Sequence, residues 1–233
     1  MESKRIAIIT ARGGSKRIPK KNIKEFCGKP IIAYSIEAAL KSDIFDEVMV
    51  STDSEEITDI ARQYGANVPF MRSAKTSDDY ATTSDVIMEV LEKYQEMGQT
   101  FDYICCIYPT APFVTSDKLK EAMSIMEKND VVEVMPVVQF SYPPQRCFVI
   151  GDDNYMKYKY EEYMQSRSQD LEKQYHDAGQ FYIYDADKYV KLSGKISGGI
   201  MPIIVSELEV QDIDNEDDWK IAELKYRLVN GEK

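Results

Sequence analysis

Short apolar runs alternate with amphipathic segments along the first 139 residues of the chain. The apolar runs are typical of buried strands, and the segments between them repeat apolar residues at the spacing of a helix. This alternation predicts βαβ units and therefore an α/β fold with a mostly parallel sheet flanked by helices. The predicted strands cover residues 6–9, 48–50, 68–71, 103–108, 131–138, 181–184 and 200–205. The predicted helices include residues 30–40, 53–64, 116–128 and 216–228.

The alternation stops in residues 140–180, which are rich in Tyr, Pro and charged residues. Long excursions in compact domains are usually lids or binding segments. We therefore divide the chain into an α/β core (1–139), an excursion that covers a second substrate or meets a partner subunit (140–180), and a return to the core (181–233). The alternative for the excursion is an ordinary surface insertion.

The composition excludes several classes of protein. The net charge of −11 argues against binding of duplex nucleic acid, although Lys and Arg are concentrated in the first 24 residues, which favours a local anion site. One His and four Cys without a C-x-x-C pair argue against a structural zinc site. The sequence shows neither a signal peptide nor an 18-residue apolar run, so we expect a cytoplasmic protein without membrane contact.

A basic loop directly follows the first predicted strand. It contains two glycines, which let backbone N–H groups approach phosphate oxygens, and cations suited to a triphosphate. Its spacing matches neither the P-loop nor the dinucleotide fingerprint. We interpret it as a triphosphate site, with a basic surface turn as the alternative. Its relevant residues are Arg12, Gly13, Gly14, Ser15, Lys16, Arg17 and Lys21.

Two aspartates, Asp212 and Asp214, follow the last predicted strand. Carboxylates two residues apart on an extended chain point in the same direction. Paired hard oxygens suit Mg²⁺, which usually also contacts the phosphates of a substrate. Capping of the final helix by Asp214, or simple solvation of both groups, explains the spacing equally well.

Two further groups of polar residues are candidates for binding. Arg72, followed by residues 77–79 and 82–84, is suited to reading a base and a ribose, or is a surface Arg before a helix cap. Arg146 and Arg167, with the only histidine, His176, are suited to an acidic sugar. A single His is more often structural than catalytic, and the polar run that holds His176 with Arg167 and Asp177 brings the two interpretations level.

The motifs together resemble the cytidylyltransferases that activate nonulosonic (nine-carbon, sialic-acid-like) sugars as CMP-sugars. The matching pieces are IITARGGSKRIPKKNIKEFCGKP, VMVSTDSEEI, FMRSAKTSDD, YPTAPF and DIDNEDDW, in this order along nearly the whole chain. The resemblance implies a Rossmann-like nucleotidyltransferase that uses Mg²⁺ and forms a homodimer in which the excursion reaches across to the partner.

The resemblance also implies roles for individual residues. The CTP-binding residues would be Arg12, Gly13, Ser15, Lys16, Lys21, Asn22, Arg72 and Thr83. Asp212 and Asp214 would hold the metal, and the catalytic residues would be Arg12, Lys21 and Asp212. Arg146, Arg167, His176 and Gln180 are the candidates for contact with the acceptor sugar.

Two differences from the sialic-acid enzymes indicate which branch of this family the chain resembles. Tyr108 stands where sialic-acid enzymes usually have Gln, and residues 176–179 read His-Asp-Ala-Gly where those enzymes carry Arg-Pro-Asn-Gly. Residues 167–171 and 175–182 resemble the pseudaminic acid branch. The expected reaction is attack of the sugar's anomeric hydroxyl on the α-phosphate of CTP, which releases pyrophosphate. The alternatives are legionaminic acid, sialic acid or an eight-carbon acid as acceptor, and a regulatory nucleotide-binding module without catalysis.

Overall fold

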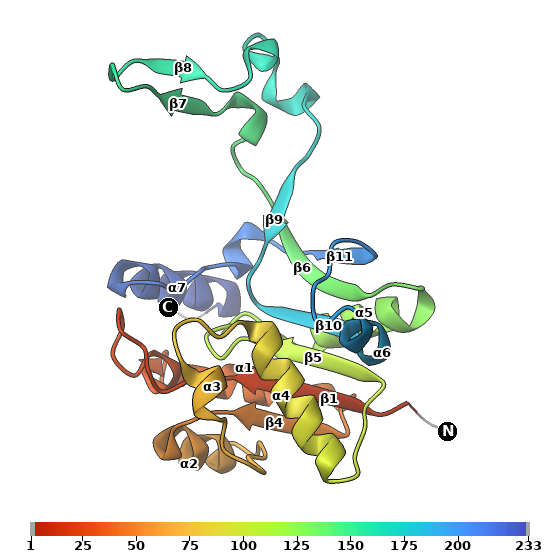
Figure 1. Cartoon of the computed structure of the whole chain (residues 1–233). Coiled ribbons are helices and arrows are strands. Elements are labelled where there is room, and N and C mark those ends of the chain that lie inside the picture. Colours follow the sequence, from red (N-terminus) through yellow and green to blue (C-terminus); the bar gives the residue numbers. More distant parts are fainter. Residues whose placement is uncertain (1–2, 232–233) are drawn as a thin grey trace.

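A mixed, mostly parallel sheet of seven strands forms the centre of the computed structural model, which describes residues 3–231 (Figure 1). The strand order is β11-β6-β10-β5-β1-β4, and β9 pairs with β6. β10 runs antiparallel to β5 and β6, and β9 runs antiparallel to β6, whereas the other pairs are parallel. The predicted α/β fold with a mostly parallel sheet is therefore confirmed. The strands are β1 (Arg5–Thr10), β4 (Glu47–Ser51), β5 (Tyr103–Ile107), β6 (Glu133–Gln139), β9 (Tyr175–Asp177), β10 (Phe181–Asp185) and β11 (Ile200–Ile204).

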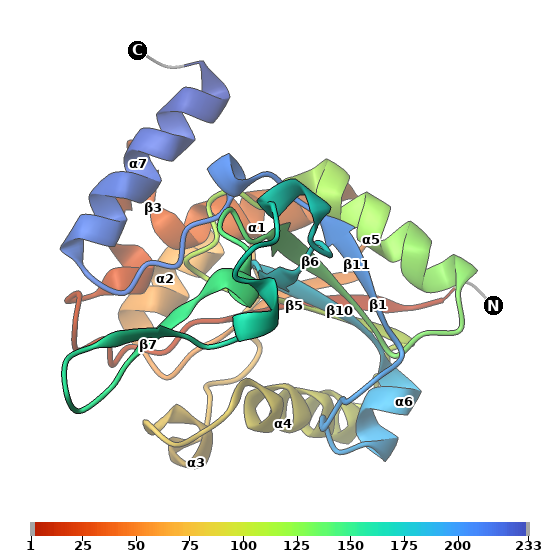
Figure 2. The ribbon, with the colours of Figure 1, turned by 90° about the horizontal axis from the view of Figure 1, so that it is seen from above.

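Helices cover both faces of this sheet (Figure 2). Alternate residues of β1 point to opposite faces: Ala7 and Ile9 pack with α1, α2 and α5, and Ile6 and Ile8 pack with α4 and α6. Burial on both faces explains why the strand is a continuous apolar run. The helices are α1 (Ile31–Ser42), α2 (Glu55–Gln63), α3 (Ala74–Ser77), α4 (Thr83–Glu96), α5 (Ser116–Lys128), α6 (Ala186–Lys191) and α7 (Glu216–Asn230). Within residues 3–231, no helix is both long and apolar enough to span a membrane.

The last helix, α7, holds the preceding segment, residues 205–215, against the core. Its Trp219 ring packs edge-on against Phe26, at 5.6 Å between centroids, beside the hairpin of β2 (Glu25–Phe26) and β3 (Lys29–Pro30). Asn215 caps the helix by accepting hydrogen bonds from the N–H groups of Asp217 and Asp218. We call residues 205–215 the connector, because they lead from β11 to α7 and carry both candidate metal ligands.

The predicted strand over residues 68–71 is wrong. Only Asn67 bridges to a strand, at Met49 of β4, and the following residues leave the sheet. Pro69 has no N–H group to donate to the ladder, so pairing ends there. Val68 is nevertheless buried, at 6% exposure, which explains why its apolar neighbourhood resembles a strand in sequence.

The excursion stands away from the sheet (Figure 1). At its far end lies a hairpin of β7 (Phe148–Ile150) and β8 (Met156–Tyr158), with Ile150 and Met156 largely exposed. The chain leaves along β6 and returns along β9, whose Tyr175 pairs with Gln139. The segment therefore rejoins the sheet at Tyr175, inside the range assigned to the excursion from the sequence.

Replacing Glu133 with Gln should remove part of the pH dependence of stability. Glu133 in β6 is 7% exposed, and burial, with the nearby charge of Asp177, raises the pKa of its carboxyl to about 7 from 4.5. The folded state thus binds a proton more tightly than the unfolded state, and this contribution, up to about 3 kcal/mol, is lost as the pH rises from 4.5 to 7. Urea unfolding at several pH values should show a flatter dependence for Glu133→Gln, with exposed Glu121→Gln as the control. Identical pH profiles for Glu133→Gln and wild type would contradict this assignment.

Candidate functional site

Three adjoining cavities open beyond the carboxyl ends of β1, β5 and β6, where ligands of open α/β sheets bind. The central cavity is lined by Thr10, Arg12, Ser15, Lys16, Arg17, Lys21, Asn22, Tyr108, Pro109, Thr110 and Asp214. The α4 cavity shares Thr10 and Arg12 with it and adds Arg72, Thr76, Asp78, Asp79, Ala81, Thr82, Thr83 and Val86. The β9 cavity shares Tyr108 and Thr110 with the central cavity and adds His176, Asp177, Tyr182, Asp212 and Lys225, among others.

The side chain of Asn22 fixes the backbone of the basic loop. The side chain of Asn22, which is 8% exposed, donates a hydrogen bond of 2.8 Å to the carbonyl oxygen of Arg12. Asn22 lies in the short turn Lys21–Ile23, and the preceding residue, Lys20, adopts a left-handed conformation with φ of 54°. The loop is therefore closed by an amide that faces inward, while the cations around it line the cavity.

The loop also contacts the connector directly. Lys21 donates a hydrogen bond of 2.8 Å to the carbonyl oxygen of Ile213, and Arg17 forms an ion pair of 2.7 Å with Asp214. Burial lowers the pKa of Lys21 below its usual value, although the negative charges of Asp214 and Asp212 oppose this shift. The structure thus places a partly buried ammonium group beside the two candidate metal ligands.

Asp79 neutralises two cations of the loop. Its carboxylate accepts a hydrogen bond of 2.9 Å from Arg12 and pairs through its other oxygen with Lys16. Hydrogen bonds from Lys16 and then from Arg12 lower the pKa of Asp79. An incoming polyphosphate would compete with this carboxylate for the same two cations.

Replacing Asp79 with Asn should increase the affinity for CTP, the nucleotide that the resemblance implies. Exposed ion pairs contribute little each, so removal of a competing carboxylate should tighten binding by about 3- to 10-fold. Isothermal titration calorimetry would measure the change, with exposed Asp59→Asn on α2 as the matched control. Weaker binding in the Asp79 variant would show that this carboxylate supports the nucleotide site.

The α4 cavity brings Arg72 and Thr83 together with Arg12. Arg72 is 8% exposed and donates hydrogen bonds of 3.0 and 2.6 Å to the hydroxyl and carbonyl oxygens of Ser51. Burial lowers its pKa, opposed by the charges of Asp53 and Glu89. The guanidinium is thus held in one orientation at the end of β4.

The β9 cavity contains His176 and Asp212. The Nδ1 atom of His176 donates a hydrogen bond of 2.8 Å to the carbonyl oxygen of Asp177, and its ring packs on Phe140 at 4.8 Å between centroids. Lys225 lines the same cavity, and its ammonium group donates to the carbonyl oxygens of Val210, at 2.7 Å, and Glu207, at 3.2 Å. Because carbonyl oxygens already accept two of its protons, Lys225 also holds the connector in place.

Two predicted residues have different surroundings from those expected. The N–H group of Gly13 donates to Asp53 at 2.8 Å instead of facing the cavity, and a Cβ atom there would lie 3.2 Å from that of Ser54. Gly13 therefore allows close packing of the loop on the start of α2. Gln180 is 3% exposed and donates to the carbonyl oxygen of Glu209, so it supports the connector from behind the cavity wall.

The two arginines predicted for the acceptor lie in the excursion. Arg146 donates a hydrogen bond of 3.2 Å to the hydroxyl of Ser168, and Arg167 directly precedes the turn Ser168–Asp170. Within the described chain, neither lines the β9 cavity.

Tyr182 belongs to the β9 cavity, although the sequence analysis did not select it as a candidate for contact with the acceptor. Its hydroxyl donates a hydrogen bond of 2.6 Å to Asp177, and its ring packs edge-on against Tyr108 at 5.4 Å between centroids. Burial raises the pKa of Tyr182 far above its usual value, so the group stays protonated. The alternation of Phe181, Tyr182, Ile183 and Tyr184 in β10 was the available signal, because it places both tyrosines on one face of the sheet.

The donor set of the connector fits a hard divalent cation only in part. Asp212 and Asp214 line neighbouring cavities on either side of Ile213, and the described residues hold no cluster of three or more His, Cys, Asp or Glu side chains able to bind a metal. Mg²⁺ typically uses one or two carboxylates and completes its shell with substrate phosphates and water. The pair therefore fits a cation that binds together with a polyphosphate.

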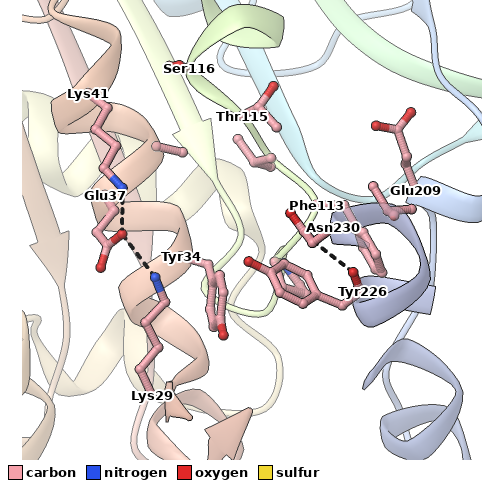
Figure 3. Close-up of a pocket in the computed structure, with 14 residues that line it drawn as sticks. Lys29, Tyr34, Glu37, Lys41, Phe113, Thr115, Ser116, Glu209, Tyr226 and Asn230 are labelled. Carbon is pink, nitrogen blue, oxygen red and sulfur yellow. Dashed lines mark hydrogen bonds and ion pairs between the residues drawn. The ribbon is translucent and has the colours of Figure 1, made fainter. Parts of the chain in front are cut away.

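A further cavity lies between α1, the start of α5 and α7 (Figure 3). Lys29 and Lys41 both point toward Glu37 and pair with it at 2.9 Å. Among its lining residues, two lysines are balanced by Glu37 and Glu209. The central cavity instead sets four Lys or Arg side chains against Asp214, which makes it the better site for a polyphosphate.

Comparison with known proteins identifies relatives along nearly the whole chain. A family model described as cytidylyltransferase matches residues 6–195. The chain is 42% identical over 225 residues to the pseudaminic acid cytidylyltransferase of Campylobacter jejuni (serotype O:2), covering 97% of both chains. It is 35% identical to the CMP-N,N'-diacetyllegionaminic acid synthase of Legionella pneumophila, covering 96% of both.

A Helicobacter pylori relative joins two activities in its name: pseudaminic acid cytidylyltransferase and UDP-2,4-diacetamido-2,4,6-trideoxy-beta-L-altropyranose hydrolase. This chain is 36% identical to it over 223 residues, which cover 95% of this chain and 42% of that protein. Among solved structures, CMP:2-keto-3-deoxy-manno-octonic acid synthetase in complex with CTP superposes with a TM-score of 0.69 at 18% identity, over 98% of this chain and 100% of that one. That likeness supports the Rossmann-like fold.

Proposed function

The chain belongs to the cytidylyltransferase family, and on that premise we propose its reaction: CTP and pseudaminic acid give CMP-pseudaminic acid and pyrophosphate. The observation that carries this proposal is 42% identity to a pseudaminic acid cytidylyltransferase over 97% of both chains. The three adjoining cavities support the proposal, because two substrates need adjacent binding sites.

The nucleotide occupies two of the cavities in this proposal. Arg72 and Thr83 contact the cytidine side in the α4 cavity, while Arg12, Ser15, Lys16 and Lys21 bind the phosphates in the central cavity. The acceptor enters the β9 cavity and its anomeric hydroxyl attacks the α-phosphate in line. No covalent enzyme intermediate is required, because positioning and charge stabilisation supply most of the acceleration in such transfers.

The loop cations stabilise the charge that develops on the departing pyrophosphate. Lys21 is suited to this role, because its ammonium group is partly buried and held at the connector by the carbonyl oxygen of Ile213. The displacement of Asp79 from Arg12 and Lys16 accompanies phosphate binding.

Members of this family generally use a divalent metal, and we propose Mg²⁺ for this chain. Asp212 and Asp214 are the residues that would hold it, together with phosphate oxygens of CTP. Bound there, the ion would stabilise negative charge on the α-phosphate and lower the pKa of the attacking hydroxyl. The ion pair between Arg17 and Asp214 keeps the second carboxylate oriented toward the loop.

We further propose that the enzyme acts as a cytoplasmic homodimer. The excursion exposes Phe148, Ile150 and Met156 far from its own core, which favours burial against a partner. Arg146 and Arg167 would then reach the partner's β9 cavity and contribute there to binding of the sugar carboxylate.

A panel of acceptors would test the proposed reaction. Pyrophosphate release would be measured with CTP, Mg²⁺ and, in turn, pseudaminic, legionaminic, sialic and eight-carbon keto-deoxy acids. The expected result is a kcat/KM at least about 100-fold higher for pseudaminic acid than for sialic acid, because unpaired polar groups in a matched pocket are costly. Preference for another acid would overturn the proposed acceptor, and absence of turnover with every acid would overturn the proposed activity.

A further inference from the structure

Two tyrosines, Tyr108 and Tyr182, line the β9 cavity together with Asp177. The ring of Tyr108, which directly follows β5, packs edge-on against Tyr182 of β10 at 5.4 Å between centroids, and the Tyr182 hydroxyl is hydrogen-bonded to Asp177, the last residue of β9. Tyr182 is 7% exposed, so it is largely shielded from water.

The direction of this hydrogen bond follows from its acceptor. An ionised carboxylate only accepts, so the Tyr182 hydroxyl donates its single proton to Asp177. The orientation of the Tyr182 hydroxyl at the cavity wall is therefore fixed by Asp177.

Asp177 is held in one orientation and still faces the cavity. One carboxylate oxygen accepts the N–H group of Gly179 at 2.7 Å, and the other accepts Tyr182 at 2.6 Å. A carboxylate has about four acceptor positions, so each oxygen retains one. In the part of the chain that the structure describes, no Lys or Arg side chain forms an ion pair with Asp177, although the residue lines the β9 cavity.

We infer that Asp177 is a specificity-determining residue for the acceptor: it accepts a hydrogen bond from an N–H or O–H group of the sugar, and Tyr182 and Gly179 hold its carboxylate in place. This inference rests on the proposed function, because it requires the sugar to occupy the β9 cavity. An unpaired carboxylate selects hydrogen-bond donors and repels acidic groups. It therefore favours an orientation in which an amide or hydroxyl of the sugar faces Asp177 and the acid group of the sugar lies elsewhere.

Steady-state kinetics of Asp177→Asn would test the inference, with pyrophosphate release as the signal. This change keeps the shape and removes the charge. We expect the KM for the acceptor to rise by about 10- to 50-fold, as for loss of a charge-assisted hydrogen bond, and the KM for CTP to stay within about twofold. Tyr182→Phe retains the ring and releases the carboxylate, so it should raise the acceptor KM by about 3- to 10-fold.

Acceptor analogues separate direct contact from a structural role. Analogues that each lack one N–H or O–H donor would be compared in wild type and Asp177→Asn. Removal of the donor that contacts Asp177 should lower activity with wild type. The same removal should not lower activity further with Asp177→Asn, because the variant has already lost that contact. Equal losses for every analogue in both proteins, an unchanged acceptor KM in Asp177→Asn, or matched increases in the KM values of both substrates would overturn the inference.

The same assays distinguish this inference from the proposed function. A wild-type protein that turns over no nonulosonic acid would overturn both. An active wild type with an insensitive Asp177→Asn variant would overturn only the role of Asp177. Urea unfolding of each variant provides the folding control, and Tyr182→Phe keeps the test open where Asp177→Asn does not fold.

Discussion

Asp212→Asn is expected to lower kcat by about 1,000-fold or more while the protein remains folded. Asp212 lines the β9 cavity next to the phosphate site, and its charge acts on Lys21 across the connector. As a proposed metal ligand it acts where charge develops during transfer, and loss of one such stabilising group costs about 100- to 1,000-fold on its own. Loss of metal affinity adds to this in an assay at fixed Mg²⁺.

Rapid-quench turnover at saturating CTP and acceptor would measure this effect, with Mg²⁺ varied. Asp217→Asn is the matched control, because Asp217 also lies near the start of α7 but its side chain is 85% exposed and pairs with Lys220. Full turnover by Asp212→Asn would remove the residue from the proposed metal site. Rescue at high Mg²⁺ would instead show that the residue acts through metal affinity.

Arg12→Ala is expected to raise the KM for CTP by about 10- to 100-fold, with a smaller effect on the KM for the acceptor. Its guanidinium lines both the central and the α4 cavities, so it is placed to contact the nucleotide along the phosphates. Hydrogen bonds between charged groups contribute about 1.5–3 kcal/mol, which corresponds to this range. The bond from Asn22 reaches the backbone of Arg12 and so remains in the variant.

Lys20→Ala is the matched control for Arg12→Ala. Lys20 belongs to the same basic loop, but it pairs with Glu56 and does not line the central cavity. Initial-rate measurements across CTP concentrations should therefore show near wild-type CTP use for Lys20→Ala. Equal KM values in both variants would mean that general positive charge, and not a placed guanidinium, attracts the nucleotide.

Local sequence signals predicted much of the core. The helix expected at residues 116–128 has these bounds in α5, because Thr115 caps its first turn and apolar residues follow at helical spacing. The strand predicted at residues 68–71 is wrong because Val68 is buried without strand pairing, and Pro69 has no N–H group with which to continue the ladder. Apolar character thus indicated the interior correctly and the local conformation wrongly.

The site depends on contacts between residues far apart in sequence. Lys21 bonds to Ile213 across 192 positions, and no local pattern predicts such a contact. The resemblance to a family associates the loop with the connector, but it does not predict the contacts of individual side chains. Gln180 is a candidate for contact with the sugar in sequence, whereas its side chain bonds to the carbonyl oxygen of Glu209. Asp79 pairs with loop residues more than 60 positions away.

The exposed hairpin at the far end of the excursion has a consequence for how the protein behaves on dilution. The distal hairpin of β7 and β8 has two strands and a face of exposed apolar side chains, and isolated hairpins of this size are only marginally stable in water. If a second copy supplies the missing contacts, the order of this segment is governed by mass action. Hydrogen exchange in residues 145–165 should then slow as protein concentration rises through the dimer dissociation constant, while exchange in β1 and β5 stays constant.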